Sequence, residues 1–262
     1  MAEYETVLYR AKNGVATLTL NRPDLLNAFN DQMIEETHSA LRTAGRDETV
    51  RCLVITGSGR AFSSGQDLGA VQEREEALSF GEHLRARYNP LIHTMRTMEK
   101  PIIASVNGAA AGAGCSLALA CDLRILSEGA TLIEVFINVG LIPDTGSTFF
   151  LPRMVGASKA FEWAVTAHRI TAEEAQRWGI ANVVVSPDRL EKTTQEWARR
   201  LAEAPTKAIA LTKRALNRSW ALSLEEALEY EAMLQEVAGR TEDHAEGVAA
   251  FLEKREPRFQ GR

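Results

Sequence analysis

Two glycine-containing segments of the sequence have residue types and positions suited to binding a carbonyl group. Phe62–Leu68 lies in a glycine-rich stretch that begins at Gly57, directly after the short apolar run Cys52–Thr56. Asn107–Cys115 follows a second apolar run, Ile102–Val106. Glycine lets the backbone approach a ligand closely and expose its N–H groups, and ligands in parallel α/β sheets bind beyond the carboxyl ends of the strands. The two segments are therefore predicted to form one pocket.

The chemistry expected of such a pocket is stabilisation of negative charge on an oxygen atom. N–H groups in the first turn of a helix lack intrahelical partners and carry the positive end of the helix dipole. Each N–H that meets an oxygen on which charge develops is worth roughly 3 kcal/mol in the transition state. Two converging donors would suit enolate chemistry beside a thioester carbonyl.

Both segments also have plainer interpretations. The first is equally consistent with a flexible loop, and the small residues of the second would also allow a helix to pack closely on a sheet. A dinucleotide fingerprint is a third alternative, but Gly112-Ala113-Gly114 is followed by Cys115-Ser116-Leu117, so the third glycine is missing. No phosphate-binding lysine follows either. The occurrence of two such segments, each after an apolar run, favours the pocket.

The elements that must position these segments follow from the apolar pattern. Short apolar runs alternate with helical periodicity, which predicts an α/β fold with a parallel sheet and right-handed crossovers. The predicted strands are Tyr4–Tyr9, Val15–Leu20, Cys52–Thr56, Ile102–Val106, Leu123–Leu126 and Ala181–Val185, with a hairpin turn at Lys12-Asn13-Gly14. The predicted helices are Gln32–Ala44 with Asp31 as its N-cap, Glu73–Met98, Ala113–Ala120, Ser158–Thr166, Ala172–Trp178, Leu190–Glu203, Thr206–Ser219, Ser223–Ala238 and Thr241–Lys254.

The composition is that of an ordinary globular protein. The 262 residues are 45% hydrophobic and 25% charged, enough to bury a substantial core. A net charge of −5 gives no general attraction to nucleic acid or anionic lipid. The N-terminus lacks a signal-peptide pattern, and no apolar stretch approaches the roughly 20 residues that span a bilayer. Three cysteines and five histidines show no metal-ligand spacing. We expect a cytoplasmic protein without a metal site and without nucleic-acid or membrane partners.

Several stretches of the sequence carry a resemblance to a known family. In chain order they are Asn21-Arg22-Pro23, Leu26-Asn27-Ala28, Ala61–Leu68, Lys100–Ala104, Asn107-Gly108, Gly112–Cys115, Cys121-Asp122, Gly140–Pro143 and Phe251–Arg255. Each is short, but their order over almost the whole chain resembles the crotonase superfamily of enoyl-CoA hydratases and isomerases. The motifs are most similar to those of the ring-epoxide phenylacetyl-CoA isomerases and the Δ3,Δ2-enoyl-CoA isomerases.

The resemblance implies an α/β fold built as a spiral of β-β-α units. It implies a catalytic core over residues 1–200 and a helical oligomerisation region over residues 201–262, assembled as a homotrimer or a dimer of trimers. It also implies an acyl-CoA substrate, a bent coenzyme A thioester, with no separate cofactor.

The resemblance also assigns binding roles to individual residues. The oxyanion hole falls on the backbone N–H groups of Gln66 and Ala113; alanine replaces the usual glycine at 113, which does little harm if its φ is negative. The loop Leu25–Ala28 and the stretch Ser64–Leu68 correspond to the adenine and pantetheine contacts, made largely by backbone groups. The substrate-binding residues implied in this way are Leu26, Ala28, Ser64, Gly65, Gln66, Asp67, Leu68 and Gly112.

The acid–base positions separate the possible reactions. Hydratase members use two glutamates, and an ungapped comparison places Ser116 and Phe136 at those positions. Neither side chain can act as a carboxylate base. Glu134 is nearby, but strand alternation would put it on the same face as Phe136, displaced by two residues. A local shift that brings Glu134 into the site remains an alternative.

The sequence has an aspartate at position 144, and the isomerase members of the family also carry an aspartate at this position. One carboxylate suffices for a 1,3-proton shift, and apolar neighbours such as Leu141 and Phe149 should raise its pKa toward neutrality. The plainer interpretation of Asp144 is an N-cap for a helix beginning near Thr145, and the two roles are compatible.

We therefore expect an acyl-CoA isomerase that shifts a double bond or rearranges a ring epoxide, with Asp144 as acid and base. An enoyl-CoA hydratase that uses another carboxylate, such as Glu134, is the main alternative. A non-catalytic CoA-binding or RNA-binding scaffold is a third, and it fits poorly with the acidic net charge.

The identity of the acyl group does not follow from the sequence. The helix near Glu73–Met98 is expected to cover the acyl pocket, and the motifs lean toward phenylacetate rather than fatty-acid degradation. The basic pairs Lys213-Arg214 and Lys254-Arg255 are expected to be solvated charges, with contact to CoA phosphates as the alternative.

Overall fold

The computed structural model describes residues 4–72 and 79–262. The chain starts with an antiparallel hairpin of β1 (Val7–Lys12) and β2 (Val15–Leu20). The two turn residues, Asn13 and Gly14, have positive φ angles of 52° and 79°, as a tight two-residue hairpin requires. The predicted turn is confirmed, but the first strand begins at Val7 rather than at Tyr4.

Six strands form the larger sheet in the order β1-β2-β3-β5-β7-β10. All neighbours from β2 onward are parallel, as the alternation of strands and helices predicted. The central strands are β3 (Cys52–Gly57) and β5 (Ile102–Val106), and every residue of β5 is buried. β7 (Leu123–Ser127) pairs with β5, and β10 (Val183–Val185) forms the edge beyond β7, so the short strand predicted in the second half of the chain joins this sheet.

Four strands of three residues each, which the sequence pattern did not predict, form a second sheet in the order β4-β6-β8-β9. They are β4 (Ala61–Ser63), β6 (Ala109–Ala111), β8 (Thr131–Ile133) and β9 (Arg169–Thr171). In the chain β4 follows β3, β6 follows β5 and β8 follows β7, so each unit gives one strand to each sheet. This repetition forms the expected spiral of β-β-α units.

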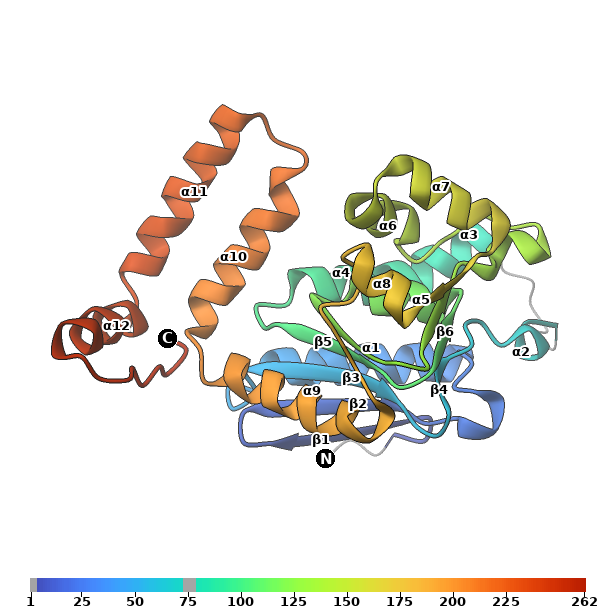
Figure 1. Ribbon diagram of the computed structural model, residues 1–262, viewed down its shortest axis with the longest axis horizontal. Coiled ribbons are helices and arrows are strands. Elements are labelled where there is room, and N and C mark those ends of the chain that lie inside the picture. Colours follow the sequence, from blue (N-terminus) through green and yellow to red (C-terminus); the bar gives the residue numbers. More distant parts are fainter. Residues whose placement is uncertain (1–3, 73–78) are drawn as a thin grey trace.

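Helices cover both faces of the larger sheet (Figure 1). α1 (Asp31–Arg46) packs on β1 and β2, whereas α9 (Pro187–Ala202) packs on β2, β3, β5 and β7. Under α9 lies a small core that includes Val54, Ile103 and Ile125, and the main core lies on the other face. Because the sheet is buried on both faces, its central strands are continuous apolar runs.

Several shorter helices complete the first 200 residues. The predicted helix Glu73–Met98 lies partly outside the described residues, and its described part is α3 (Phe80–His83), a π-helical turn η2 (Leu84–Tyr88) and α4 (Asn89–Thr97). The remaining elements are η1 (Pro23–Leu25), α2 (Leu68–Gln72), α5 (Ala113–Ala120), η3 (Val135–Val139), α6 (Ser147–Val155), α7 (Ala157–Thr166) and α8 (Ala172–Arg177). The predicted N-cap of α1 is wrong by one residue, because the side chain of Asn30 accepts the Met33 N–H at 2.9 Å.

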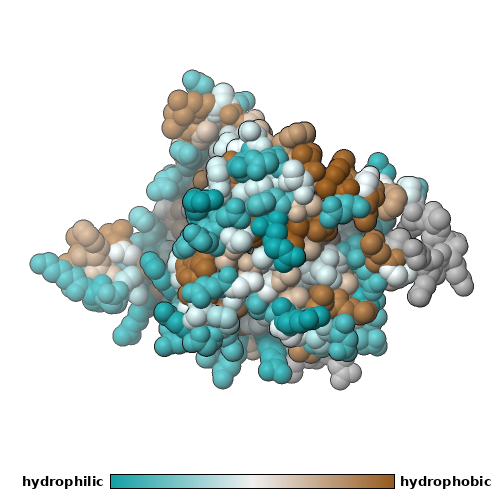
Figure 2. Space-filling view, turned by 45° about the vertical axis from the view of Figure 1, so that its right-hand side comes forward, coloured by the Kyte–Doolittle hydropathy of each residue, from teal (hydrophilic) through white to brown (hydrophobic). Residues whose placement is uncertain are grey.

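Three helices form an arm that leaves the body of the molecule (Figure 1). They are α10 (Thr206–Ser219), α11 (Leu224–Gly239) and α12 (Glu242–Glu253). The arm exposes large apolar side chains, and brown surface covers its tips in Figure 2. Those exposed by more than half are Leu216, Trp220, Leu224, Leu228, Met233, Phe251 and Leu252. Within the described part of the chain, no helix has the length and apolar character needed to cross a membrane.

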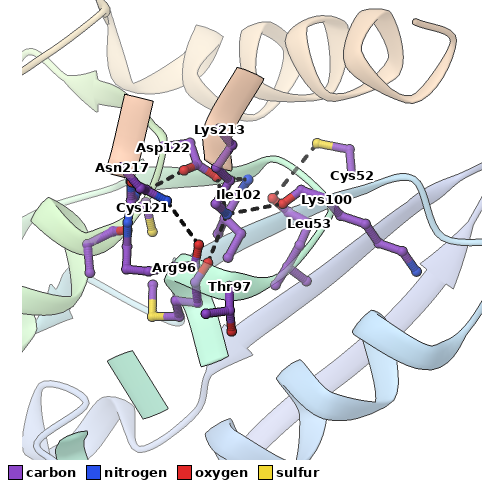
Figure 3. A network of polar contacts seen from close by, with 12 residues as sticks. Cys52, Leu53, Arg96, Thr97, Lys100, Ile102, Cys121, Asp122, Lys213 and Asn217 are labelled. Atoms are coloured by element: carbon purple, nitrogen blue, oxygen red, sulfur yellow. Dashed lines mark hydrogen bonds and ion pairs between the residues drawn. The ribbon is translucent and has the colours of Figure 1, made fainter. Parts of the chain in front are cut away.

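A buried polar network holds α10 against the body (Figure 3). Asp122, between α5 and β7, accepts a hydrogen bond from Arg96 of α4 at 3.0 Å and one from Lys213 of α10 at 2.8 Å. It also accepts the Ile102 N–H at 2.9 Å, and Lys213 donates to the Met95 carbonyl at 2.8 Å. The side chain of Lys213 is only 7% exposed. Lys213 is therefore a buried ion-pair partner, and its interpretation as solvated charge is wrong.

Candidate active site

The two glycine-containing segments meet at the start of α5. Gly65 has a φ of +92°, and a Cβ atom added there would lie 2.7 Å from the Ala111 carbonyl oxygen and 3.4 Å from the Ala113 nitrogen. Such contacts leave no room for a side chain. The backbone of the first segment thus lies directly against the N-terminus of the helix that the second segment begins.

Gln66 and Ala113 both present backbone N–H groups that the fold does not use. A parallel bridge joins Phe29 to Gln66, but its two hydrogen bonds use the Gly65 carbonyl and the Asp67 N–H. Ala113 is the first residue of α5, where N–H groups have no intrahelical acceptor. Its φ is not positive, so the condition set for alanine at this position is met. Within the described chain, neither N–H has a protein acceptor.

Close packing and hydrogen bonds together fix the position of Gln66. A Cβ atom on Gly114 would lie 2.6 Å from the Ser63 Cβ, so glycine lets α5 approach the end of β4. The side chain of Gln66 donates to the Phe29 carbonyl at 2.8 Å and accepts the Tyr88 hydroxyl at 2.7 Å. These two hydrogen bonds restrict rotation of the Gln66 side chain and so fix the direction of the Gln66 backbone.

The implied coenzyme A loop packs against the same segment. Leu26 and Asn27 have positive φ angles of 51° and 56°, and the fully buried Asn27 amide donates to the Ser58 and Ala61 carbonyls at 2.9 Å each. The Ser64 N–H donates to the Leu26 carbonyl at 2.9 Å. The structure therefore brings the two implied contact regions together.

The remaining implied substrate-binding residues surround this junction. Arg22 forms an ion pair with Asp67 at 2.9 Å and donates to the Ala28 carbonyl at 2.5 Å. Leu68 is 55% exposed at the start of α2. Gly112 is buried and its N–H donates to the Ile133 carbonyl, which ties the second glycine-containing segment to β8.

Asp144 lies in the turn that follows η3 and is half-buried. Burial raises the pKa of Asp144, while the Thr145 hydroxyl, which donates to Oδ1 at 2.7 Å, and the nearby His83 lower it in part. Thr145 has a positive φ of 53°, which is costly for a β-branched residue and marks a strained turn. The N-cap interpretation of Asp144 is wrong, because α6 begins at Ser147 and its N-cap is Gly146, which has no side chain.

The positions of the two hydratase glutamates lie beside the oxyanion segment and hold other residues. The Ser116 hydroxyl is 3.1 Å from the Gly112 carbonyl and 3.1 Å from the Asp144 carbonyl. The Phe136 ring is buried, and its Cζ lies 3.9 Å from a Cβ atom built on Gly112. A polar hydroxyl and an apolar ring thus line this part of the site.

Glu134 does not occupy the strand position that alternation suggested. β8 ends at Ile133, and a 3₁₀ turn, η3, begins at Val135. The Glu134 carboxyl points into the protein, the residue is 1% exposed, and its Oε1 lies 2.8 Å from the Ser147 hydroxyl oxygen. Burial raises its pKa to about 7.

Two functional neighbours could not be found from the sequence. Tyr88 holds the Gln66 side chain, and His83 acts on Asp144 and lies 3.1 Å from an oxygen of Asp31. Both come from the helical segment before α4, far from the glycine segments in the chain, and no spacing rule links them. Among the described residues, no group of three or more histidine, cysteine, aspartate or glutamate side chains is arranged to hold a metal ion.

Comparison with known proteins agrees with this geometry. The family model for enoyl-CoA hydratase/isomerase matches residues 10–262. The chain is 42% identical to the 1,2-epoxyphenylacetyl-CoA isomerase of Escherichia coli, with 98% of this chain and 99% of that protein covered. It is 43% identical to a protein of Rhodobacter capsulatus named a probable enoyl-CoA hydratase, with 99% of each covered.

The solved structures show the same fold. The crystal structure of an enoyl-CoA hydratase from Mycobacterium smegmatis superposes with a TM-score of 0.90 at 34% identity, covering 97% of this chain and 99% of that one. The spiral fold expected from the sequence is thereby confirmed. The chain belongs to the enoyl-CoA hydratase/isomerase family of the crotonase superfamily.

Proposed function

We propose that the protein is an acyl-CoA isomerase in which Asp144 moves a proton and the Gln66 and Ala113 N–H groups hold the enolate oxygen. One observation carries the proposal. Asp144 is a partly desolvated carboxyl whose backbone is linked to the first turn of α5, whereas Ser116 and Phe136 stand where a hydratase has glutamates. This geometry offers one acid–base group and one oxyanion site.

For an enoyl-CoA substrate, the proposed double-bond shift balances with that single carboxyl group. The Asp144 carboxylate removes a proton from the carbon whose C–H bond is acidified by the thioester, and the electron pair moves onto the carbonyl oxygen. The two N–H groups stabilise the resulting oxyanion. When the enolate collapses, the carboxylic acid returns the same proton to another carbon of the chain, and the double bond has moved.

The raised pKa of Asp144 suits this exchange. A carboxyl with an ordinary pKa is a weak base at neutral pH, and burial makes Asp144 a stronger one. The Thr145 hydroxyl holds Oδ1 and leaves Oδ2 for the substrate. The strained φ of Thr145 supports a role in aiming that carboxyl group.

The acyl group is proposed to extend between α4 and α6. A cavity of about 410 Å³ there is lined by Ile92 and His93 of α4, by Thr145 and Gly146 beside Asp144, and by Phe149 of α6. Its aromatic wall fits a ring-bearing acyl group, and the E. coli relative bears the name 1,2-epoxyphenylacetyl-CoA isomerase. A ring-epoxide acyl-CoA is therefore the substrate class that we propose first.

A homo-oligomer assembled through the C-terminal arm is proposed as the working form. The arm exposes Trp220, Leu228 and Phe251 by more than half, and burying such side chains between chains would be strongly favourable. Sedimentation at several protein concentrations would show whether the chain forms trimers or hexamers; a concentration-independent monomer would contradict this part of the proposal.

The second candidate is an enoyl-CoA hydratase, because the Rhodobacter relative has that name. Crotonyl-CoA separates the two reactions. Loss of the enoyl absorbance with formation of a 3-hydroxyacyl product would establish the hydratase, whereas an isomerase leaves crotonyl-CoA unhydrated and converts 3-enoyl-CoA or ring-epoxide substrates without adding water.

Asp144→Asn is the direct test of the proposed mechanism. The variant is expected to lose at least about a thousandfold in kcat, because proton transfer and enolate formation both depend on this carboxyl, while its affinity for the CoA thioester is unchanged. Asp188→Asn, at an exposed aspartate in the first turn of α9, is the matched control and should behave as the wild type. Near-normal turnover by Asp144→Asn on a panel of acyl-CoA substrates would refute the mechanism.

A further inference from the structure

A chain of hydroxyl groups links a buried carboxyl to the backbone of Asp144. Glu134 Oε1 lies 2.8 Å from Ser147 Oγ, and Ser147 Oγ lies 2.8 Å from Ser116 Oγ. Ser116 Oγ lies 3.1 Å from the Asp144 carbonyl oxygen and 3.1 Å from the Gly112 carbonyl oxygen. All three side chains are at most 1% exposed. The chain therefore joins the proposed acid–base residue to the helix that carries one proposed oxyanion donor.

The chain of hydroxyl groups connects three elements that the fold brings together. Glu134 follows β8, Ser147 is the first residue of α6, and Ser116 lies in the first turn of α5. The Asp144 carbonyl also accepts the Ser147 N–H at 3.0 Å. A change in the direction of the Ser116 hydroxyl therefore acts on the peptide group of Asp144 itself.

Counting protons shows which form of Glu134 the chain requires. Three contacts lie in series, from Glu134 to Ser147, from Ser147 to Ser116 and from Ser116 to the Asp144 carbonyl. Each of these contacts is a hydrogen bond only if a proton lies in it. A carbonyl supplies none and the two serines supply one each. All three contacts of the series carry a proton only when the Glu134 carboxyl supplies the third, and the single Ser116 proton is then shared between the Asp144 and Gly112 carbonyls, each 3.1 Å from Oγ.

The ionised form of Glu134 would reverse the chain. A carboxylate only accepts, so Ser147 would donate to Glu134 and Ser116 would donate to Ser147. The Asp144 carbonyl would then lose the Ser116 proton. In the protonated form each contact of the series carries a proton, and the Ser116 hydroxyl can donate to the Asp144 carbonyl, which shares that proton with the Gly112 carbonyl.

We infer that Glu134 is a positioning residue for Asp144, and that its protonated carboxyl directs the Ser147 and Ser116 hydroxyls so that Ser116 donates to the Asp144 carbonyl. This inference rests on the proposed function, in which Asp144 is the acid–base group. Glu134 does not touch substrate, because its carboxyl is buried behind α5 and α6.

The surroundings of Glu134 favour the protonated form. Burial raises the pKa of Glu134 to about 7, the Ser147 and Cys115 side chains lower it in part, and the charge of Asp144 raises it further. Oε2 forms no hydrogen bond of ordinary geometry within the described part of the chain, a costly arrangement for a carboxylate and a cheaper one for a neutral acid. An ionised Asp144 and a neutral Glu134 are thus mutually compatible.

The pH dependence of kcat tests the inference, measured on the substrate that the wild type converts best. Wild-type kcat is expected to fall by about tenfold as the pH rises through the titration of Glu134, since loss of the aligned hydrogen bond misplaces the base. Glu134→Gln should remove this alkaline decline, because its amide donates to Ser147 at every pH. Glu128→Gln, at an exposed glutamate between β7 and β8, is the matched control and should keep the wild-type profile.

Variants that interrupt the chain give an independent result. Ser116→Ala and Ser147→Ala should lower kcat by about five- to tenfold at every pH, corresponding to one hydrogen bond, with KM unchanged and no alkaline decline. An alkaline decline that persists in Glu134→Gln, or unaltered kcat in both serine variants, would overturn the inference.

An infrared titration separates this inference from the proposed function. The carbonyl stretch of a protonated carboxyl, identified by subtracting the Glu134→Gln spectrum, should be present at about pH 6 and absent at about pH 8. This readout needs no turnover, so it stands even if Asp144→Asn proves active. A Glu134 already ionised at about pH 6 would refute the protonated chain, whatever the reaction.

Discussion

Replacing Asp122 by alanine is expected to destabilise the protein strongly, because two cations would lose their counter-ion inside the fold. Asp122 accepts from Arg96 at 3.0 Å and from Lys213 at 2.8 Å, and it also holds the Ile102 N–H at 2.9 Å. Lys213 is 7% exposed and Arg96 is 25% exposed, so solvent can replace little of what Lys213 loses. Burial lowers the pKa of Lys213, and Asp122 acts in the opposite direction.

The magnitude follows from the degree of burial. Removing one partner of a buried ion pair costs about 3–5 kcal/mol, and the partial exposure of Arg96 favours the lower end, about 3 kcal/mol. For a chain of this length the unfolding entropy converts such a loss into a Tm decrease of about 6 °C. Lys213→Met is the informative comparison. It removes the buried cation, leaves Asp122 with Arg96 and Ile102, and should cost only about 1 kcal/mol.

Urea unfolding followed by circular dichroism would measure both losses. The protein concentration must be held constant, because assembly stabilises the folded state by mass action. The double variant should be less destabilised than the sum of the single variants, since Asp122 and Lys213 share one interaction. Equal losses for Asp122→Ala and Lys213→Met would refute the reasoning, because they would mean that the stranded cations cost nothing.

Three further outcomes are expected. Gly114→Ala should cost about 1–3 kcal/mol in urea unfolding, because its Cβ would lie 2.6 Å from Ser63, whereas Gly129→Ala, with open space around it, should change stability by less than about 0.5 kcal/mol; similar losses would contradict the packing argument. Folding raises the pKa of Glu134 from 4.5 to about 7. Between these two pH values the folded state holds a proton that the unfolded state has released. The free energy of unfolding of the wild type should therefore fall by up to about 3 kcal/mol as the pH rises through this range. Glu134→Gln should remove this pH-dependent loss of stability. If the wild type and Glu134→Gln had the same urea midpoint at every pH in this range, the prediction would be wrong. Asn27→Ala removes the amide that fixes the loop beside Ser63 and should weaken CoA-thioester binding in calorimetry; unchanged affinity would show that the loop is not part of the binding site.

The sequence by itself predicted the elements that are long and strongly patterned. Cys52–Thr56 and Ile102–Val106 are continuous apolar runs because the larger sheet is buried on both faces, and such runs can be recognised locally. The strands of the second sheet could not be recognised. Each has three residues, too few to show a period, and they become strands because distant segments pair with them.

The sequence also identified the two glycine-containing segments that meet at the start of α5, since glycine is required where backbone meets backbone. Gly65 and Gly114 are needed because a Cβ atom would meet another segment within 3 Å, and such requirements are visible as residue types. The local structure around Asp144 was less predictable. The plainer interpretation of Asp144 was a helix N-cap, but the strained turn at Thr145 moves the start of α6 to Ser147.

What only the tertiary structure decided is the meeting of side chains far apart in the sequence. The direction of the Glu134 carboxyl depends on the end of β8 and the start of η3, and its partners Ser147 and Ser116 come from two other helices. His83 reaches Asp144 in the same way, from another part of the chain. Residue types and local periodicity specify backbone and burial, whereas hydrogen-bond partners depend on ångström-scale placement of separate elements. The sequence alone thus determined the family and the two glycine-containing segments that meet at α5, and the packing of α5, α6 and β8 decided which buried groups lie beside Asp144.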